Sequence, residues 1–456
     1  MPLDGLTLHV LIQELDPLLK NGRVLKIYQP DETTITIQFR LLRKTETLLI
    51  STDPLYPRLH TLQEQPQNPL NPPAFCMLLR KYLEPSRLIR IGQEGLDRIV
   101  YLQFEGMGPL GQSTELTMVF ELMGRHSNLY LLSDDGVILD ALKRFPDKGI
   151  MPGQPYRKPS DQDKVDPRSL SPEAFFDELR LVPGPTPLWK WLTESFQGFS
   201  KLAATEVLAR AGLHVSLKRV DLEEADWTAV HTAFHQLLRE LEQGGTPSFY
   251  ADEPQDFSAY QLTGRGGQPF ATTNSLVAQV LGQGQSHKKL EEFKRRLRKQ
   301  LLRHHKRVIK KEAIQQTTLQ EAEQADIYRH QGELLTASFH MIKQGASEVH
   351  VQDYTKENAP LVAISLDPRL SASANVQRIF KRYSKAKASQ KHTSLQLEQT
   401  QLEKAYLEDT LLQIDLADNE EILGEIEAEL GKMGYLKRTT KSRSKKDQAV
   451  LGPDRY

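Results

Sequence analysis

Charged residues that strand propensity does not explain gather at two places in the first third of the chain. Asp97 and Arg98 begin one predicted strand, and the segment 121–128, ELMGRHSN, interrupts another. An arginine beside a carboxylate is oriented for bidentate contact with a phosphate or a base edge, and a serine or asparagine adds neutral hydrogen bonds. A structural ion pair that caps two strands explains these residues equally well. The candidate nucleic-acid site comprises Asp97, Arg98, Glu121, Met123, Arg125, Ser127 and Asn128.

Motifs of the common hydrolytic, nucleotide-binding and metal enzymes are absent from the sequence: it contains no HExxH, GxSxG, GxxxxGK[ST] or GxGxxG that opens a helix. The single cysteine, Cys76, lies in an apolar run and excludes a zinc site of three or four thiolates. Pro2 could attack a sugar as a free N-terminal amine, but Leu3 follows it where the formamidopyrimidine-DNA glycosylases need glutamate. We therefore expect a protein without enzymatic activity, metal or cofactor.

Bulk composition describes a folded protein of about three units, since the chain has 456 residues and 39% are hydrophobic. Its 59 basic and 59 acidic residues balance, so a nucleic-acid partner must be inferred from local charge. Asp4 stands where a secretory signal would carry a basic residue, and no run approaches the roughly 20 apolar residues of a membrane helix. The sequence predicts a soluble cytoplasmic protein with no membrane partner.

The elements that would position the candidate site form an antiparallel sheet with two helices. Apolar spacing predicts helices over 6–19 and 74–83, separated by three strands and a proline-rich loop at 54–73. Further strands follow up to about residue 133, where SDDG predicts a hairpin. Residues 171–241 are predicted to be helical. The glycine turn at 197–200 is compatible with a helix-hairpin-helix that holds a phosphate, although an ordinary turn explains it better.

The last third predicts an antiparallel coiled-coil hairpin, because residues 287–343 and 376–430 carry an apolar residue every three or four positions. Between them, residues 350–368 are predicted to form two strands and a turn at the tip. The fold class is α+β. The predicted divisions are a sheet domain at 1–170, a helical domain and return segment at 171–285, the first arm at 286–345, the tip at 346–375, the second arm at 376–436 and a basic linker at 437–456.

Charge along the arms separates two kinds of basic cluster. Residues 288–311 hold twelve Lys and Arg, and residues 403–429 of the facing arm hold ten acids, so pairing between the arms is favoured over a nucleic-acid helix. The cluster just after the tip has no acid within it and is predicted to bind an external polyanion. Its residues are Arg378, Lys381, Arg382, Lys385 and Lys387.

Long motifs across the chain resemble the NFACT family, which comprises bacterial RqcH and its archaeal and eukaryotic relatives, such as NEMF. The motifs are Asp4-Gly5, FCMLLRKYL at 75–83, GLDRIVYLQF at 95–104, ELMGRHSN at 121–128, NLYLLSDDGVILDALKRF at 128–145, PGQPYRKP at 152–159 and LDPRLSASANVQRIFKRYSKAKA at 366–388. The resemblance implies a sheet domain similar in fold to the glycosylases. It also implies that Asp97 and Arg98 recruit tRNA, with Glu121 and Arg125 on the same surface.

The family resemblance further implies a function in ribosome quality control. Its members bind an obstructed large ribosomal subunit carrying peptidyl-tRNA and recruit charged tRNA, chiefly alanyl-tRNA, for untemplated tailing of the nascent chain. The tip cluster would then meet ribosomal RNA or ribosomal proteins. Full-length members continue into an NFACT-R domain, whereas this sequence ends at Tyr456, so binding rather than complete tailing is expected of it. Some members carry the name fibronectin-binding protein A, which leaves a surface adhesin as the alternative.

Overall fold

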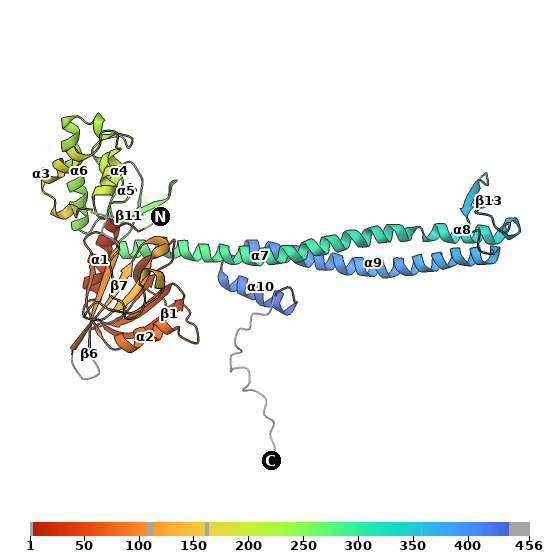
Figure 1. Ribbon diagram of the computed structural model, residues 1–456, viewed down its shortest axis with the longest axis horizontal. Coiled ribbons are helices and arrows are strands. Elements are labelled where there is room, and N and C mark those ends of the chain that lie inside the picture. The colour runs from red at the N-terminus through yellow and green to blue at the C-terminus, as the bar shows by residue number, and fades with distance from the viewer. Residues whose placement is uncertain (1–2, 108–112, 160–163, 357, 437–456) are drawn as a thin grey trace, which may run out of the picture. The chain divides into compact units, whose positions relative to one another are not determined.

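The computed structural model describes residues 3–107, 113–159, 164–356 and 358–436 (Figure 1). The chain divides into two compact units, residues 1–287 and 288–456. Pro2 and the basic linker at 437–456 lie outside the described residues. No helix in the described part of the chain is long and apolar enough to cross a lipid bilayer.

The first unit is built on a nine-stranded sheet in the order β4-β3-β2-β1-β5-β6-β7-β8-β9, in which every neighbouring pair is antiparallel. The predicted antiparallel sheet is therefore confirmed. The strands are β1 (Arg23–Asp31), β2 (Thr34–Arg40), β3 (Thr45–Ser51), β4 (Arg58–Leu62), β5 (Arg87–Gln93), β6 (Ile99–Met107), β7 (Ser113–Glu121), β8 (Asn128–Leu132) and β9 (Ile138–Ala141).

The strand β4 corrects the prediction of a loop throughout residues 54–73. Residues 58–62 pair with β3 in register, from Arg58 opposite Ser51 to Leu62 opposite Thr47, and Leu59 is fully buried. Prolines before and after this segment suggested a loop. They are compatible with β4 because it lies at the edge of the sheet, where fewer backbone N–H groups must pair.

Two helices, α1 (Gly5–Leu19) and α2 (Ala74–Leu83), pack against the sheet as predicted. In α1, Leu8, Leu11, Leu15 and Leu19 follow helical spacing and enter the sheet core, while Leu6 and Val10 enter a second core. Helix α1 therefore joins the sheet to the helical part of the same unit. The carboxylate of Asp4 caps α1 by accepting the Thr7 N–H at 2.8 Å.

The helical part contains α3 (Pro172–Leu181), α4 (Leu188–Ser195), α5 (Lys201–Arg210) and α6 (Glu224–Glu242), which lie together in Figure 1. A small sheet follows, of β10 (Ser248–Tyr250), β11 (Asp256–Ser258) and β12 (Gln268–Pro269). The core of this part is aromatic, with Phe175 stacked on Phe196 and Phe199 stacked on Phe234. The segment 196–200 connects α4 to α5 as the predicted turn.

The long helix α7 (Thr273–Glu323) begins thirteen residues before the predicted start of the first arm at 286. Its first turn belongs to the first unit, because the Glu14 carboxylate accepts the Thr273 and Asn274 N–H groups at 2.7 and 2.8 Å. Leu276 and Val277 are buried in the sheet core. These tertiary contacts, rather than coiled-coil periodicity, place the start of the helix.

The second unit contains the remainder of α7, then α8 (Ala325–Ala337), β13 (Glu348–Gln352), β14 (Leu361–Ser365), α9 (Ala372–Leu416) and α10 (Glu420–Lys432). The predicted two-stranded tip is confirmed by the antiparallel pair β13–β14. The second arm is not continuous to 436: it stops at Leu416, and Asn419 caps α10 by accepting the Ile422 N–H at 2.9 Å. The physical reason is a third helix in the bundle, since Leu423, Ile426 and Leu430 of α10 are buried with residues of α7 and α9.

Ion pairs between the helices confirm the predicted charge pairing. On α7, Arg298 pairs with Asp415 at 2.9 Å and His305 contacts Glu408 at 3.1 Å, while the acid Glu312 pairs with Lys404 at 3.0 Å. A further α7 cation, Arg296, pairs with Glu427 of α10 at 3.0 Å. Each exposed pair contributes little stability, about 1 kcal/mol at most. Their common register nonetheless favours one alignment of the arms.

Candidate nucleic-acid interface

The two candidate segments lie at the same end of one strand pair. In the ladder of β6 and β7, Ile99 stands opposite Glu121, and the Leu122 N–H donates to the Arg98 carbonyl at 2.9 Å. Asp97 and Arg98 form the turn before β6 rather than its first residues. Residues 122–127 connect β7 to β8 through the short 3-10 helix Gly124–His126 and do not interrupt a single strand. Both corrections concern local structure, and the segments remain adjacent.

The turn that carries Asp97 is held by side-chain and backbone hydrogen bonds. The Asp97 N–H donates to the Glu94 carbonyl at 2.8 Å. The Gln93 amide donates to the Asp97 carbonyl at 2.8 Å and to the Gly5 carbonyl at 3.0 Å. The turn is thereby fixed to the start of α1, where the sequence has the Asp4-Gly5 motif.

Close backbone packing brings the turn at 196–200 to the same place. A Cβ atom on Gly5 would lie 2.0 Å from the Leu96 carbonyl oxygen and 2.6 Å from the Gly198 Cα. Gly198 itself has φ +81°, which favours glycine. The Gln197 side-chain oxygen accepts the Leu96 N–H at 3.3 Å. Packing against α1 and the 94–98 turn accounts for this glycine, which supports the ordinary helix–helix turn over a phosphate-binding loop.

The guanidinium groups of Arg98 and Arg125 form no ion pair with any carboxylate in the described residues. The Asp97 carboxylate accepts the backbone N–H of Arg98 at 2.7 Å, and Arg125 donates to the His126 ring at 3.0 Å. Arg125 is exposed and Arg98 half-buried. Among the described residues, neither guanidinium therefore forms the strand-capping ion pair that the sequence left open, and both groups can contact an anion.

A third cation, Lys164, which sequence reasoning missed, lies near Asp97 and Arg98. Burial lowers the pKa of Lys164, and the Asp97 carboxylate partly offsets this effect, while the positive charge of Arg98 adds to it. The Lys164 carbonyl also accepts the Gln197 amide at 3.2 Å. No motif marks Lys164 in the sequence, because its proximity depends on the docking of the 196–200 turn.

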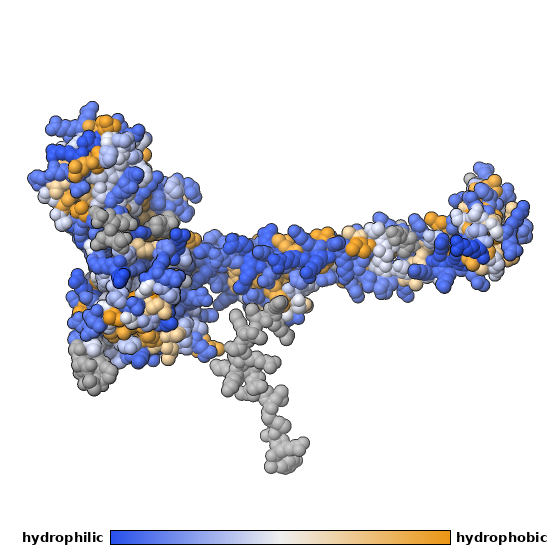
Figure 2. All heavy atoms as spheres, viewed as in Figure 1, coloured by the Kyte–Doolittle hydropathy of each residue, from blue (hydrophilic) through white to orange (hydrophobic). Residues whose placement is uncertain are grey.

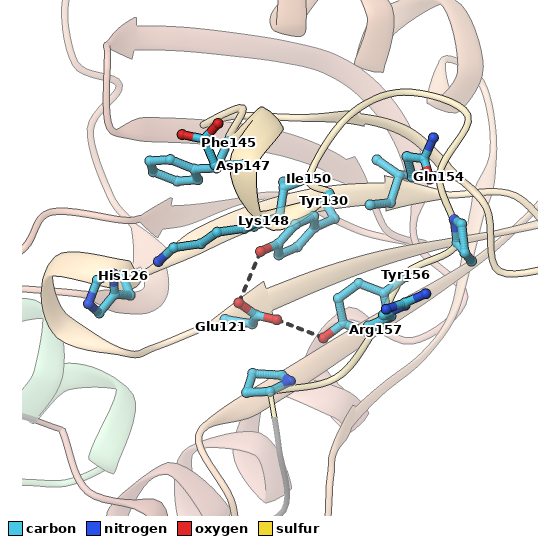
Figure 3. Close-up of a pocket in the computed structure, with 14 residues that line it drawn as sticks. Glu121, His126, Tyr130, Phe145, Asp147, Lys148, Ile150, Gln154, Tyr156 and Arg157 are labelled. Carbon is cyan, nitrogen blue, oxygen red and sulfur yellow. Dashed lines mark hydrogen bonds between the residues drawn. The ribbon is translucent and has the colours of Figure 1, made fainter.

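Glu121 is buried, with 6% of its surface exposed, and its carboxylate is held by two tyrosines. The Tyr130 and Tyr156 hydroxyls donate to its two oxygens at 3.1 and 2.8 Å (Figure 3). Burial raises the pKa of the Glu121 carboxyl, and these two hydrogen bonds partly offset the shift. Glu121 therefore positions the two tyrosines. Because it also lines the adjacent cavity, its predicted contact with a ligand stays a prediction.

A cavity of about 620 Å³ opens beside this carboxylate. Its wall combines the rings of Tyr130, Tyr156 and Phe145 with the cations Lys148 and Arg157, as Figure 3 shows. Tyr130 and Tyr156 meet edge to face with ring centroids 5.3 Å apart. Aromatic faces beside cations suit an unstacked base and its phosphate. Sequence reasoning did not assign these residues a role, although Tyr156 and Arg157 lie in the PGQPYRKP motif.

Three other candidates hold the site together instead of facing solvent. Ser127 and Asn128 are buried, at 0% and 1% exposure. The Asn128 side chain donates to the Lys143 carbonyl at 2.8 Å and accepts the Lys143 N–H at 2.9 Å, which joins β8 to the segment after β9. Met123 is half-buried against the small core that includes Ile99. Because both side chains are buried, hydrogen bonds from Ser127 and Asn128 to a nucleic acid would need a local rearrangement, and their predicted role stays a prediction.

The tip cluster in the second unit is largely free. Lys381, Arg382 and Lys385 are exposed and form no ion pair with a described carboxylate, and the exposed Lys387 contacts the Tyr383 hydroxyl at 3.1 Å. Arg378 differs, because it approaches Asp367 at 3.8 Å and donates to the Ser365 carbonyl at 3.4 Å. It therefore stabilises the tip, and the free cluster is smaller than predicted. Figure 2 shows hydrophilic surface over much of this end of the arm.

Comparison with known proteins identifies the family of this chain. A family model of the NFACT N-terminal and middle domains matches residues 4–449. The chain belongs to the NFACT family. The Rqc2 homolog RqcH of Bacillus subtilis (strain 168) is 30% identical over 458 residues, which cover 98% of this chain and 78% of that protein. The human ribosome quality control complex subunit NEMF is 32% identical over 137 residues, 30% of this chain and 12% of that protein.

Solved structures of NFACT-like proteins share the fold of the first part of the chain. The fibrinogen binding protein from Staphylococcus aureus has a TM-score of 0.54 and 28% identity, covering 61% of this chain and 98% of that one. The N-terminal part of the fibronectin/fibrinogen-binding protein from Streptococcus suis has a TM-score of 0.51 and 27% identity, covering 60% and 97%. The names of these relatives thus refer to ribosome quality control in some cases and to binding of fibrinogen or fibronectin in others.

Proposed function

We propose that this protein is a non-catalytic ribosome quality control factor of the cytoplasm. It binds a large ribosomal subunit obstructed by peptidyl-tRNA and recruits charged tRNA, chiefly alanyl-tRNA, for untemplated tailing of the stalled chain. Its membership of the NFACT family, with RqcH and NEMF among its relatives, supports this proposal. The structural observation that carries it is the pair Arg98 and Arg125 at one end of β6 and β7, neither of which pairs with a carboxylate among the residues that the structure describes.

The chemistry of that end of the sheet suits tRNA better than a small metabolite. Arg98 and Arg125 contact the phosphate backbone, which positions the RNA without reading its sequence. The cavity beside Tyr130 and Tyr156 accepts one unstacked base, and Lys148 and Arg157 at its wall contact the adjoining phosphates. Asp97, held against Arg98, accepts hydrogen bonds from a base or a ribose hydroxyl. This division of roles follows from which side chains are exposed and which are buried.

The tip cluster supplies a second, separate contact with the ribosome. Exposed lysines and arginines at the end of a coiled-coil hairpin fit the polyanionic surface of ribosomal RNA. Charge reversal by Lys385→Glu/Lys387→Glu is expected to abolish pelleting with large subunits while tRNA binding to the free protein stays within twofold. Pelleting at the wild-type level would contradict the assignment of the tip.

Fluorescence anisotropy with alanyl-tRNA tests the site directly. The Arg98→Ala/Arg125→Ala variant is expected to lose at least about tenfold in affinity, or 1.4 kcal/mol. The matched control is Arg23→Ala/Arg40→Ala, which removes the same charge from exposed positions paired across β1 and β2, at the opposite end of the sheet from Arg98. Equal losses in both variants would show that net charge, and not this site, determines affinity.

The second candidate function is an adhesin, favoured only by the names of the two solved structures. Surface plasmon resonance with immobilised fibronectin and fibrinogen discriminates between the two functions. An adhesin would bind either protein with a Kd below about 1 μM and would bind large ribosomal subunits only weakly. A ribosome quality control factor shows the opposite preference.

A further inference from the structure

Helix α7 carries a row of cations that the ion pairs between the helices do not use. Between Glu292 and Glu312 the sequence contains no acid, and five basic residues recur at intervals of four, four, three and four positions. At about 100° per residue, this spacing confines their side chains to roughly 80° of the helix circumference. We call this row the basic stripe. Its members are Arg295, Lys299, Arg303, Lys306 and Lys310.

The basic stripe faces away from the rest of the bundle. Leu297, Leu301 and Val308 are buried against α9 and α10, and helical geometry puts them on the side of α7 opposite the stripe. The cations that pair with α9 and α10 are different residues, Arg298 and Arg296. The ion pairs that set the register of the arms therefore do not involve the residues of the basic stripe.

All five stripe residues are exposed, and none forms an ion pair within the described part of the chain. Like charges spaced three or four residues apart on a helix repel by about 0.2–0.5 kcal/mol per pair. A polyanion laid along the stripe would relieve this repulsion and release counterions. The row runs over sixteen residues, from Arg295 to Lys310, and is about 22 Å long.

We propose that the basic stripe binds the phosphate backbone of an RNA double helix. The choice of RNA over another polyanion rests on the proposed function, whereas the site itself rests on the stripe's geometry. A double helix is favoured over a single strand because the stripe contains no aromatic residue, and single-strand sites use aromatic rings to stack bases. Phe293, the nearest ring before the stripe, is half-buried against the bundle core. Contacts restricted to phosphates would bind RNA of any sequence.

Salt-dependent binding of the whole chain to a labelled RNA duplex of about 24 base pairs tests the proposal without ribosomes. The variant Lys299→Gln/Arg303→Gln/Lys306→Gln keeps good helix formers and removes three charges. Its affinity is expected to fall at least tenfold. The slope of log Kd against log salt is expected to decrease by about two to three, since each lost phosphate contact accounts for about 0.9.

The control variant Lys20→Gln/Arg23→Gln/Arg40→Gln removes the same charge from exposed positions in the first unit and is expected to bind within twofold of wild type. A stripe variant that also binds within twofold of wild type, or a control that loses as much as the stripe variant, would overturn the proposal. Alanyl-tRNA binding by the stripe variant separates the two proposals. The stripe alone fails if duplex affinity is unchanged while Arg98→Ala/Arg125→Ala still weakens tRNA binding.

Discussion

Substitution of Gly5 by alanine tests the packing that positions the Asp97 turn. The new Cβ atom would lie 2.0 Å from the Leu96 carbonyl oxygen, and real contacts of this kind are essentially never shorter than 3.0 Å, so the turn must move by about 1 Å. Both close neighbours, Leu96 O and Gly198 Cα, are backbone atoms, and no rotation of a side chain can relieve the overlap. Overpacking of this kind costs about 1–3 kcal/mol, and we expect the upper end, about 2–3 kcal/mol.

Urea unfolding followed by tryptophan emission measures this loss of stability in the first unit of the chain. All three tryptophans, Trp189, Trp191 and Trp227, lie in residues 1–287. With a slope of roughly 3 kcal/mol per molar urea, the midpoint should fall by about 0.7–1 M. Affinity for tRNA should fall as well, since the turn carries Arg98. The control is Gly282→Ala, which meets no atom within 4 Å and should not destabilise the unit. A Gly5→Ala midpoint within 0.2 M of wild type, with unchanged tRNA affinity, would refute the reasoning.

Two further predictions concern buried groups of the first unit. Tyr156→Phe removes the hydroxyl that donates to the Glu121 carboxylate at 2.8 Å. It should lower the free energy of unfolding of the first unit by about 1.5–3 kcal/mol, as measured by urea unfolding. A loss below about 0.5 kcal/mol would be inconsistent with this hydrogen bond. Burial and the positive Arg58, whose Nε–H donates to His60 at 3.2 Å, lower the pKa of His60 to about 4, although the Thr61 carbonyl 2.9 Å from its Nδ1 partly offsets the shift. The unfolded chain then binds the extra proton, and wild type should lose about 3 kcal/mol relative to His60→Gln as pH falls from 6.5 to 4. A pH-independent difference between the two proteins would contradict this assignment.

Periodicity and turn signals in the sequence predict most of the elements, and the failures have physical causes. The β4 strand was missed because its flanking prolines indicate a loop unless the strand is known to lie at an edge. The end of α9 at Leu416 was missed because neither proline nor glycine marks it, and apolar spacing continues into α10. The early start of α7 depends on Glu14, which is about 260 residues away in the sequence.

The candidate site was predicted by residue type, but the role of each residue depends on burial. Adjacency of Asp97 to the segment 121–128 follows from strand pairing, which the sequence pattern supports. Glu121 is enclosed by two tyrosines, and Asn128 bonds to Lys143. The sequence pattern does not predict these contacts, because the partners lie 9 to 35 residues away. A sequence motif identifies residues that matter together and does not separate those that face a ligand from those that hold the site.

Cosedimentation with large ribosomal subunits carrying peptidyl-tRNA, followed by sequencing of the copurified RNA, tests the central claim most directly. Wild type should pellet with the subunits and enrich particular tRNAs, alanine tRNA foremost. Asp97→Ala/Arg98→Ala should pellet equally well without that enrichment, because the tip is a separate contact. Failure of wild type to pellet, or equal enrichment of tRNA by the variant, would contradict the account.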